Sequence, residues 1–199
     1  MTIEKIKITS KDQWLALREK DITSTEISVL FGCNPYKKEI IKNEKLLEIV
    51  DKDIKLPSQI KWGTRLEPVV AQGIAEDRNL TIEKFDYYYR DPDLRLGASF
   101  DYLVKWPGGD KLLEIKCVSE FTFNNNWYKL VNNKKVHVIP QHIFLQVQQQ
   151  MLLTGIEECH IGVLVCGNRV RIFDVKSDAA VHEQIREKVS KYWRNLEIQ

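Results

Sequence analysis

The sequence lacks a run of about 18 consecutive apolar residues, the length that a membrane-crossing helix needs. Its first residues, MTIEKIKITS, also lack the apolar stretch of a secretory signal, so we expect a cytoplasmic protein. Cysteine is scarce. The residues that occur are scattered and form no C-x-x-C pair, so neither a zinc site nor a disulfide framework is indicated: Cys33, Cys117, Cys159 and Cys166.

An excess of charge of either sign is also lacking. The 30 basic and 28 acidic residues leave a formal net charge of +2, which is too small to indicate nucleic-acid binding by itself. Any basic surface must therefore be local. The candidates are the pair Lys37 and Lys38 and the segment 129–135, and charge alone favours a solvated loop for both.

The composition fits one α/β domain spanning residues 1–199. The chain is 43% hydrophobic and 29% charged, enough for a substantial core, and it shows no internal repeat. Helical patterns dominate residues 1–80, and strands begin at about residue 81. We therefore expect an N-terminal helical part (about 1–80) and a sheet-containing core (about 81–199), with a mixed sheet covered by helices.

Apolar residues at helical spacing predict helices over residues 13–18, 25–31, about 39–50, about 59–78 and about 139–154, and Asp178 is placed to cap a terminal helix. The long helix at 59–78 contains Pro68. Its predicted apolar face consists of Trp62, Leu66, Val69, Val70 and Ile74.

Alternating apolar and polar residues predict strands at 81–89, 94–106, 111–118, 160–165 and 169–175. The turn sequence 107–110 makes the second and third of these a hairpin. With the tip at Gly108 and Gly109, Asp101 faces Lys116 and lies diagonally beside Glu114. The opposite face is then core, formed by Phe100, Tyr102, Val104, Trp106, Leu113, Ile115 and Cys117.

The polar face of this hairpin has two interpretations. Adjacent carboxylates raise each other's pKa unless a cation lies between them. Asp101, Glu114 and Lys116 are therefore either a cross-strand ion pair on a solvated face, or the site of a divalent metal. In the second case the carbonyl of Ile115 supplies a third ligand and Lys116 lies beside an attacking water.

The pattern D-x(n)-E-x-K resembles the signature of the PD-(D/E)xK nucleases, and further blocks resemble the YqaJ and lambda-exonuclease type of phage recombination exonuclease. These blocks are WLALREKDITSTE at 14–26, WGTRLEP at 62–68, YRDPDLRLGASFDYL at 89–103 and QHIFLQVQQQMLLTG at 141–155. The resemblance implies a restriction-endonuclease-like core, a central mixed sheet flanked by helices.

The resemblance also implies residue roles. The catalytic residues would be Asp101, Glu114, Lys116 and Gln146. One or two Mg²⁺ ions, or Mn²⁺ as a substitute, would be held by Asp101, Glu114, the Ile115 carbonyl and Glu67. The substrate, a 5′ phosphate, would be held by Arg18 with Ser24 or Thr25, with Asp91 near the active site.

Without the resemblance, plainer roles suffice for several of these residues. Arg18 and Glu67 read as exposed helical side chains, Ser24 or Thr25 as a helix N-cap, and Asp91 as a turn residue. The glutamines of 148–150 read mostly as the polar outer face of an amphipathic helix. Gln146 shares a helical face with His142, Gln149 and Leu153, and this face is expected to point at the substrate.

The activity implied is a Mg²⁺-dependent 5′-to-3′ exonuclease that acts on linear double-stranded DNA and supplies 3′ tails to a single-strand annealing protein. The resemblance also implies a homo-oligomeric ring, trimeric or tetrameric. It implies that the gene belongs to a phage or prophage in a bacterial cell. A restriction-like or Cas4-like endonuclease is the alternative enzyme, although the late cysteines Cys159 and Cys166 are too few for an iron–sulfur cluster of the Cas4 kind. A non-catalytic DNA-end binding module is the alternative without chemistry.

Overall fold

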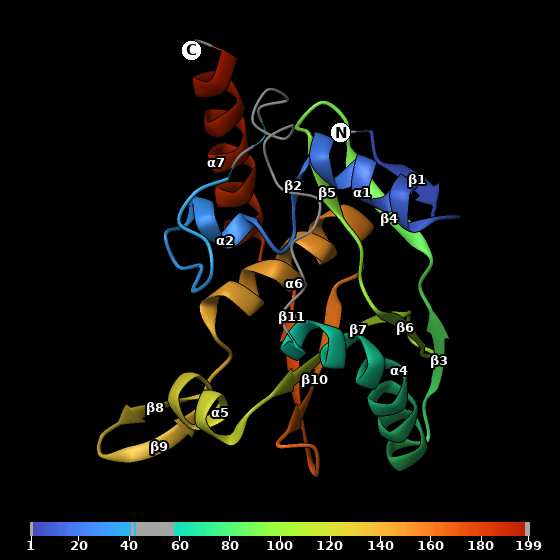
Figure 1. Cartoon of the computed structure of the whole chain (residues 1–199), viewed down its shortest axis with the longest axis vertical. Coiled ribbons are helices and arrows are strands. Elements are labelled where there is room, and N and C mark those ends of the chain that lie inside the picture. Colours follow the sequence, from blue (N-terminus) through green and yellow to red (C-terminus); the bar gives the residue numbers. More distant parts are fainter. Residues whose placement is uncertain (1, 41, 43–57, 198–199) are drawn as a thin grey trace.

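The computed structural model describes residues 2–40, 42 and 58–197 (Figure 1). The helix predicted at about 39–50 therefore lies almost entirely outside the described residues. The strands divide among three sheets of five, four and two strands. Helices flank these sheets, so the predicted α/β class with mixed sheets is confirmed.

The five-stranded sheet has the order β11-β10-β7-β6-β3. Its strands β7 and β10 run parallel, whereas the other neighbours are antiparallel. A parallel pair needs a crossover connection, and the chain between β7 and β10 supplies one that contains a long helix. The strands are β3 (Thr81–Lys84), β6 (Tyr102–Lys105), β7 (Lys111–Val118), β10 (Glu158–Val165) and β11 (Arg169–Lys176).

The four-stranded sheet has the order β1-β4-β5-β2, and a separate hairpin forms the two-stranded sheet. The predicted strands at 81–89 and 94–106 are thus each split between two sheets, because the backbone leaves the strand conformation at 85–86 and 99–101. The strands are β1 (Glu4–Lys7), β2 (Ile22–Thr23), β4 (Tyr87–Asp91), β5 (Leu96–Ala98), β8 (Tyr128–Val131) and β9 (Lys134–His137).

The helices begin and end largely where the sequence predicts. Asp178 Oδ1 accepts hydrogen bonds from the amides of Ala180 and Val181, and Gly155 ends its helix with φ of 72°. A short helix after β7 was not predicted. The helices are α1 (Lys11–Lys20), α2 (Ile27–Leu30), α4 (Ser58–Arg78), α5 (Glu120–Asn126), α6 (Gln141–Thr154) and α7 (Ala179–Glu197). None of them, within the part of the chain described, is long and apolar enough to cross a bilayer.

Two helices cover the two faces of the five-stranded sheet (Figure 1). On one face Val70 and Ile74 of α4 pack with Leu113 of β7, and on the other Met151 of α6 packs with Leu112. The apolar face predicted for α4 is wrong at Trp62 and Val69, which are 54% and 67% exposed. At 3.6 residues per turn, Trp62 and Val69 lie about 80° and 100° around the helix from Val70, and about 120° and 140° from Ile74.

The register of the β6–β7 hairpin corrects the predicted one. Tyr102 lies opposite Leu113, whereas a tip at Gly108 and Gly109 would place Ile115 there. Continuing the observed register by one residue puts Asp101 opposite Glu114 instead of Lys116. A shift of two residues keeps the paired residues Tyr102 to Val104 and Lys111 to Leu113 on their predicted faces.

The irregular backbone before β6 changes the predicted core face at one end. Phe100 does not join Tyr102 on the α4 side. Its ring stacks on Phe85 with 3.8 Å between centroids, and it packs with Leu103 in the cluster on the α6 side. Trp106, at the other end of the strand, is 49% exposed. The core face of β6 is therefore limited to Tyr102 and Val104.

Candidate active site

Two carboxyl groups of the hairpin lie close enough for the charge of Glu114 to act on Asp101. Glu114 alternates with Leu113 and Ile115 along β7, so its side chain points to the face that α6 covers, where it is 3% exposed. Asp101 precedes β6, and its Oδ2 accepts a hydrogen bond from the Ile115 amide at 2.8 Å. The two acidic residues therefore belong to neighbouring segments of one sheet and flank the same stretch of backbone.

The Glu114 carboxylate is held by three donors. Its Oε1 accepts hydrogen bonds from the Lys116 ammonium and, at 2.6 Å, from Gln146 Nε2. Its Oε2 accepts from Gln150 Nε2 at 2.9 Å, and that same nitrogen donates to the Ser99 carbonyl at 3.0 Å. A buried carboxylate needs such partners to remain charged. Strand β7 and helix α6 together fix both of its oxygens.

The electrostatics of the site favour added positive charge. Burial raises the pKa of Asp101 well above its ordinary value, and the nearby charge of Glu114 raises it further. Burial lowers the pKa of Lys116, but the charges of Glu114 and Asp101 outweigh it and raise that pKa overall. A lysine that takes a proton from water needs a depressed pKa, which Lys116 could reach only with the charge of a further cation nearby.

The donor set fits Mg²⁺. Within residues 2–40, 42 and 58–197, no group of three or more His, Cys, Asp and Glu side chains is placed to hold an ion alone. Mg²⁺ commonly uses one or two carboxylates and completes its shell with water and substrate phosphate. Asp101 and Glu114 match that pattern. The N–H and C=O of one strand residue point the same way, so the Ile115 carbonyl faces the side of Asp101.

Glu67 comes to this region from α4, on the other side of the sheet. Its Oε1 is 2.6 Å from Lys84 Nζ, which forms an ion pair with it. Its charge also contributes to the raised pKa of Asp101. Glu67 is therefore close enough to influence Asp101, while its role as a metal ligand stays a prediction.

A cleft of about 290 Å³ connects this site with the N-terminal segment. Lys116, Gln146 and His142 line one part of it, and Thr25 and Tyr36 line another. Burial and then the charge of Lys116 lower the pKa of His142. The sequence blocks at 14–26 and 141–155, more than 100 residues apart, thus meet in one hollow.

Arg18 is positioned by aromatic and hydroxyl contacts. Its guanidinium carbon lies 4.4 Å from the centroid of the Trp14 ring, and its Nη2 donates to Thr25 Oγ1 at 3.1 Å. Trp14 is tethered in turn, because its Nε1 donates to Ser99 Oγ at 3.3 Å. Burial lowers the pKa of Arg18 below its ordinary value. The arginine is therefore fixed beside Thr25, which lines the cleft, and is not a freely solvated helix-surface group.

The two candidate hydroxyls differ in exposure. Thr25 is exposed beside Arg18, whereas Ser24 is 2% exposed. Neither is a helix N-cap, because α2 starts after Glu26 without a side-chain capping bond. The N-cap interpretation is wrong. The geometry leaves Thr25 as the hydroxyl that both lines the cleft and contacts Arg18.

Asp91 has a turn role. It is 1% exposed, and its Oδ1 accepts hydrogen bonds from the amides of Asp93 at 3.0 Å and Leu94 at 3.1 Å. These bonds close the connection between β4 and β5. A role of Asp91 in substrate binding stays a prediction.

The glutamines of α6 are not on a polar outer face, so that interpretation is wrong. Gln148, Gln149 and Gln150 are all fully buried, and Gln146 is 8% exposed. Gln149 Nε2 donates to the carbonyls of Ile22 at 3.0 Å and of Gly97 in β5 at 2.9 Å, and Gln148 donates to Lys176 at the end of β11. Each glutamine thus ties the helix to surrounding structure.

Gln150 is a site residue that the sequence reasoning missed. Its contact with Glu114 was open to prediction, because it follows Gln146 by four residues and so shares its helical face. The run of glutamines hid this signal, since a polar surface accounts for such a run equally well.

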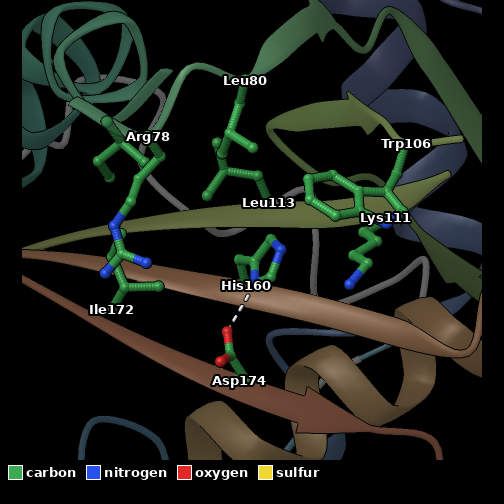
Figure 2. A pocket seen from close by; sticks show the side chains of 9 residues that line it. Arg78, Leu80, Trp106, Lys111, Leu113, His160, Ile172 and Asp174 are labelled. Carbon is green, nitrogen blue, oxygen red and sulfur yellow. Dashed lines mark hydrogen bonds and ion pairs between the residues drawn. The ribbon is translucent and has the colours of Figure 1, made fainter. Parts of the chain in front are cut away.

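A second hollow of about 180 Å³ lies on the α4 face of the sheet (Figure 2). Figure 2 shows Arg78 and Trp106 on opposite sides of it, with the His160 and Asp174 side chains below, joined by a 2.6 Å contact from Nδ1 to Oδ1. Among the described residues that line it, none belongs to the predicted site. The predicted site residues Lys116, Gln146 and Thr25 line the other cleft, of about 290 Å³.

Comparisons with known proteins give one family and a consistent fold. The family model described as the YqaJ-like viral recombinase domain matches residues 13–157. An uncharacterized protein of Acanthamoeba polyphaga mimivirus is 26% identical over 159 residues, which is 74% of this chain. The chain spans only 27% of the length of that relative.

Solved structures that share the fold include two exonucleases. The alkaline exonuclease LHK-Exo from Laribacter hongkongensis has a TM-score of 0.68 at 19% identity, covering 94% of this chain and 93% of its own. A phage-related exonuclease from Haemophilus somnus has a TM-score of 0.59 at 12% identity, covering 90% of this chain and 96% of its own.

Proposed function

Because the chain belongs to the YqaJ-like viral recombinase domain family, we propose that it is a Mg²⁺-dependent deoxyribonuclease that digests linear double-stranded DNA from its 5′ ends. It leaves 3′ single-stranded tails for strand annealing. The observation that carries this proposal is the single cleft that Lys116 and Gln146 share with Thr25, the partner of Arg18. That arrangement joins a hydrolytic site to a site for a terminal phosphate.

The chain's own groups divide the hydrolytic work. Gln146 and Gln150 fix the two oxygens of Glu114, so the carboxylate keeps one orientation. Asp101, held by the Ile115 amide, presents a second carboxylate at the same place. A bound Mg²⁺ would offset these negative charges and the charge that develops on the phosphate, and would lower the pKa of a coordinated water. Lys116 donates hydrogen bonds that orient the attacking water.

End recognition is assigned to Arg18 and Thr25. A guanidinium presents a fixed fork of N–H donors that suits phosphate, and stacking on Trp14 limits the directions in which it can point. The Thr25 hydroxyl adds one donor beside it. A 5′ phosphate held there would place the adjoining phosphodiester bonds within the cleft that leads to Lys116. This assignment gives the enzyme its requirement for ends.

The test is digestion of a duplex labelled at either end, with and without Mg²⁺, alongside a covalently closed circle. We expect Mg²⁺-dependent release of the 5′ label first, persistence of the 3′ label, and an intact circle. Cleavage of the circle would identify an endonuclease, and binding without any loss of label would identify a DNA-end binding module. Either result would contradict the proposal.

A ring assembly and an annealing protein as partner belong to the proposal as well. A ring of three or four copies would gather the weak positive charge of each chain along one inner wall, which suits a protein with a net charge of +2. Light scattering for the mass in solution tests this part independently of the digestion assay.

A further inference from the structure

The β8–β9 hairpin stands away from the body of the protein (Figure 1). Its tip is a two-residue turn in which Asn132 and Asn133 both have positive φ, 49° and 60°, as a tight hairpin turn with right-handed strand twist requires. All residues from 129 to 137 are exposed. A two-stranded ribbon is marginal alone, so what holds its base decides whether it keeps its shape.

The base of the hairpin is anchored by aromatic packing. The rings of Tyr128 and His137 lie 4.3 Å apart between centroids, and Tyr128 meets Phe123 of α5 edge-on at 5.4 Å. The amide of Val138 donates to the Trp127 carbonyl at 2.9 Å. The base of the ribbon is therefore held in place by packing on α5 and by a backbone hydrogen bond, and its outer part extends from this base.

Each outer rung of the ribbon pairs one lysine with one aliphatic residue. The pairs are Lys129 with Val136, Leu130 with Lys135, and Val131 with Lys134. Directly opposed residues share a face, so both faces of the ribbon carry ammonium groups next to apolar surface. Leu130 is 72% exposed, Val136 42% and Val131 41%.

The surrounding sequence is free of negative charge. No Asp or Glu occurs from residue 121 to residue 156, although the chain contains 28 acidic residues. The hairpin lysines therefore have no acidic neighbour in their own segment to neutralise them. Such a local excess of positive charge suits a polyanion, even though the whole chain is almost neutral.

The hairpin also adjoins the cleft. Asn126 and Trp127, which precede it, and Pro140, which follows it, line the cleft that contains Lys116. A molecule that enters the cleft passes the root of the ribbon. A ligand that extends out of the cleft on this side would therefore reach the ribbon.

We propose that the β8–β9 hairpin binds duplex DNA next to the cleft, with Lys129, Lys134 and Lys135 on backbone phosphates and the aliphatic side chains against the groove wall. This inference rests on the proposed function for the identity of the ligand. A two-stranded ribbon has the dimensions of the major groove. Lysine contacts to phosphate carry no sequence information, which suits an enzyme that must move along any sequence.

The experiment compares two triple variants of the full chain. The test variant carries Lys129→Gln, Lys134→Gln and Lys135→Gln, and the control carries Lys7→Gln, Lys176→Gln and Lys191→Gln, which remove equal charge from exposed sites elsewhere. Binding of a blunt duplex is measured by fluorescence anisotropy in EDTA at several salt concentrations. The loss of three phosphate contacts should reduce the magnitude of the slope of log K against log salt by about 2.7, at about 0.9 per contact.

The expected result is this flattening, with binding weaker by about 10- to 100-fold at low salt, in the test variant alone. With Mg²⁺, we expect a raised KM and an unchanged kcat. An unchanged salt slope overturns the inference. So does weakening confined to single-stranded DNA, or a changed mass by light scattering with unchanged DNA binding, which would identify the ribbon as a contact between copies.

The two proposals fail separately. A wild-type chain that binds duplex through the ribbon but releases no label disproves the nuclease and leaves the ribbon contact in place. A ribbon variant that digests DNA with wild-type KM and salt dependence disproves the ribbon contact and leaves the nuclease in place.

Discussion

The β8–β9 hairpin and helix α6 follow one another in the chain and have opposite surfaces. The hairpin exposes Leu130, Val131 and Val136, whereas the helix buries the polar side chains of Gln146 and its neighbours at 148–150. Each reverses the usual distribution, in which aliphatic residues lie inside and amides outside. Both departures lie next to the same cleft.

The difference shows two ways in which a site uses residues that stability alone does not favour. Buried amides lose water, so they stay only where they bond to protein, and here Gln146 and Gln150 hold Glu114 in place. Exposed aliphatic groups gain nothing in the free protein and become useful when a ligand covers them. The helix therefore holds the carboxylate that we propose to be catalytic, and the hairpin exposes the surface that we propose to bind DNA.

The largest effect is expected from Asp101→Asn, which removes a negative charge from the carboxylate pair that α6 helps to hold. Digestion should fall by more than the roughly 10- to 100-fold typical of residues that only support a metal ligand. Asparagine retains the oxygen that accepts from the Ile115 amide, so the fold is kept. Digestion of labelled duplex at saturating Mg²⁺ measures the loss, and activity near wild type would contradict the role of Asp101.

The same variant should be more stable than wild type without metal at neutral pH. The pKa of Asp101 is raised in the folded protein by burial and by Glu114. A raised carboxyl pKa stabilises the fold only at low pH, and this contribution is lost as the pH rises from the unfolded-state pKa through the folded-state pKa. Thermal unfolding in EDTA should give the variant the higher Tm, and Mg²⁺ should raise Tm in wild type alone.

A smaller effect is expected from Gln150→Leu, which breaks the buried network of α6. It leaves Glu114 Oε2 and the Ser99 carbonyl without a donor, at a cost of about 1–3 kcal/mol, and should lower kcat by about 10- to 100-fold. Urea unfolding and single-turnover digestion measure the two losses.

Gln148→Leu is the matched control on the same helix. Gln148 bonds to the Lys176 carbonyl and the Asp178 amide, away from Glu114. We expect a similar loss of stability with normal kcat below the unfolding temperature. Equal kcat losses in the two variants would mean that the glutamines act only through the fold.

Much of the fold could be predicted from local patterns. Strand β7 matches its prediction at both ends, and α6 begins within two residues of it, because each has a strong period and a turn or glycine at its end. The split of 81–89 between two sheets could not be predicted, since both halves alternate alike. The division depends on which partner strand each half meets.

The candidate site, like the fold, could be predicted only in part from the sequence. The proximity of Asp101 to Glu114 could be predicted from the hairpin, because Asp101 directly precedes β6 and Glu114 lies in the paired strand β7. The burial of Gln148–Gln150 does not follow from any period, because it depends on carbonyls contributed by Ile22, Gly97 and Lys176, which are distant in sequence. Long-range partners decide whether an amide lies inside or outside.

Thr25→Val and Ser24→Ala test which of two adjacent hydroxyls, the exposed one or the buried one, binds the 5′ phosphate. Thr25 is exposed and bonds to Arg18, so its loss should reduce the preference for 5′-phosphorylated over 5′-hydroxyl ends several-fold, with little change in stability. Ser24 is buried, so its loss should lower stability and keep the preference. Competition between the two kinds of end measures the ratio, and the reverse pattern would assign the phosphate to Ser24.

The smallest effect on stability is expected from Leu130→Ser at the outer part of the hairpin. A side chain that is 72% exposed contributes little to the core, so the free energy of unfolding should change by no more than about 0.5 kcal/mol. Leu145→Ser, on a helical residue that is 2% exposed, should cost at least about 2 kcal/mol. If Leu130 serves the substrate, its variant should still bind duplex DNA more weakly than wild type. If neither stability nor DNA binding changes, Leu130 has no role in recognition. The lysines of the hairpin would then bind DNA without help from the aliphatic residues opposite them.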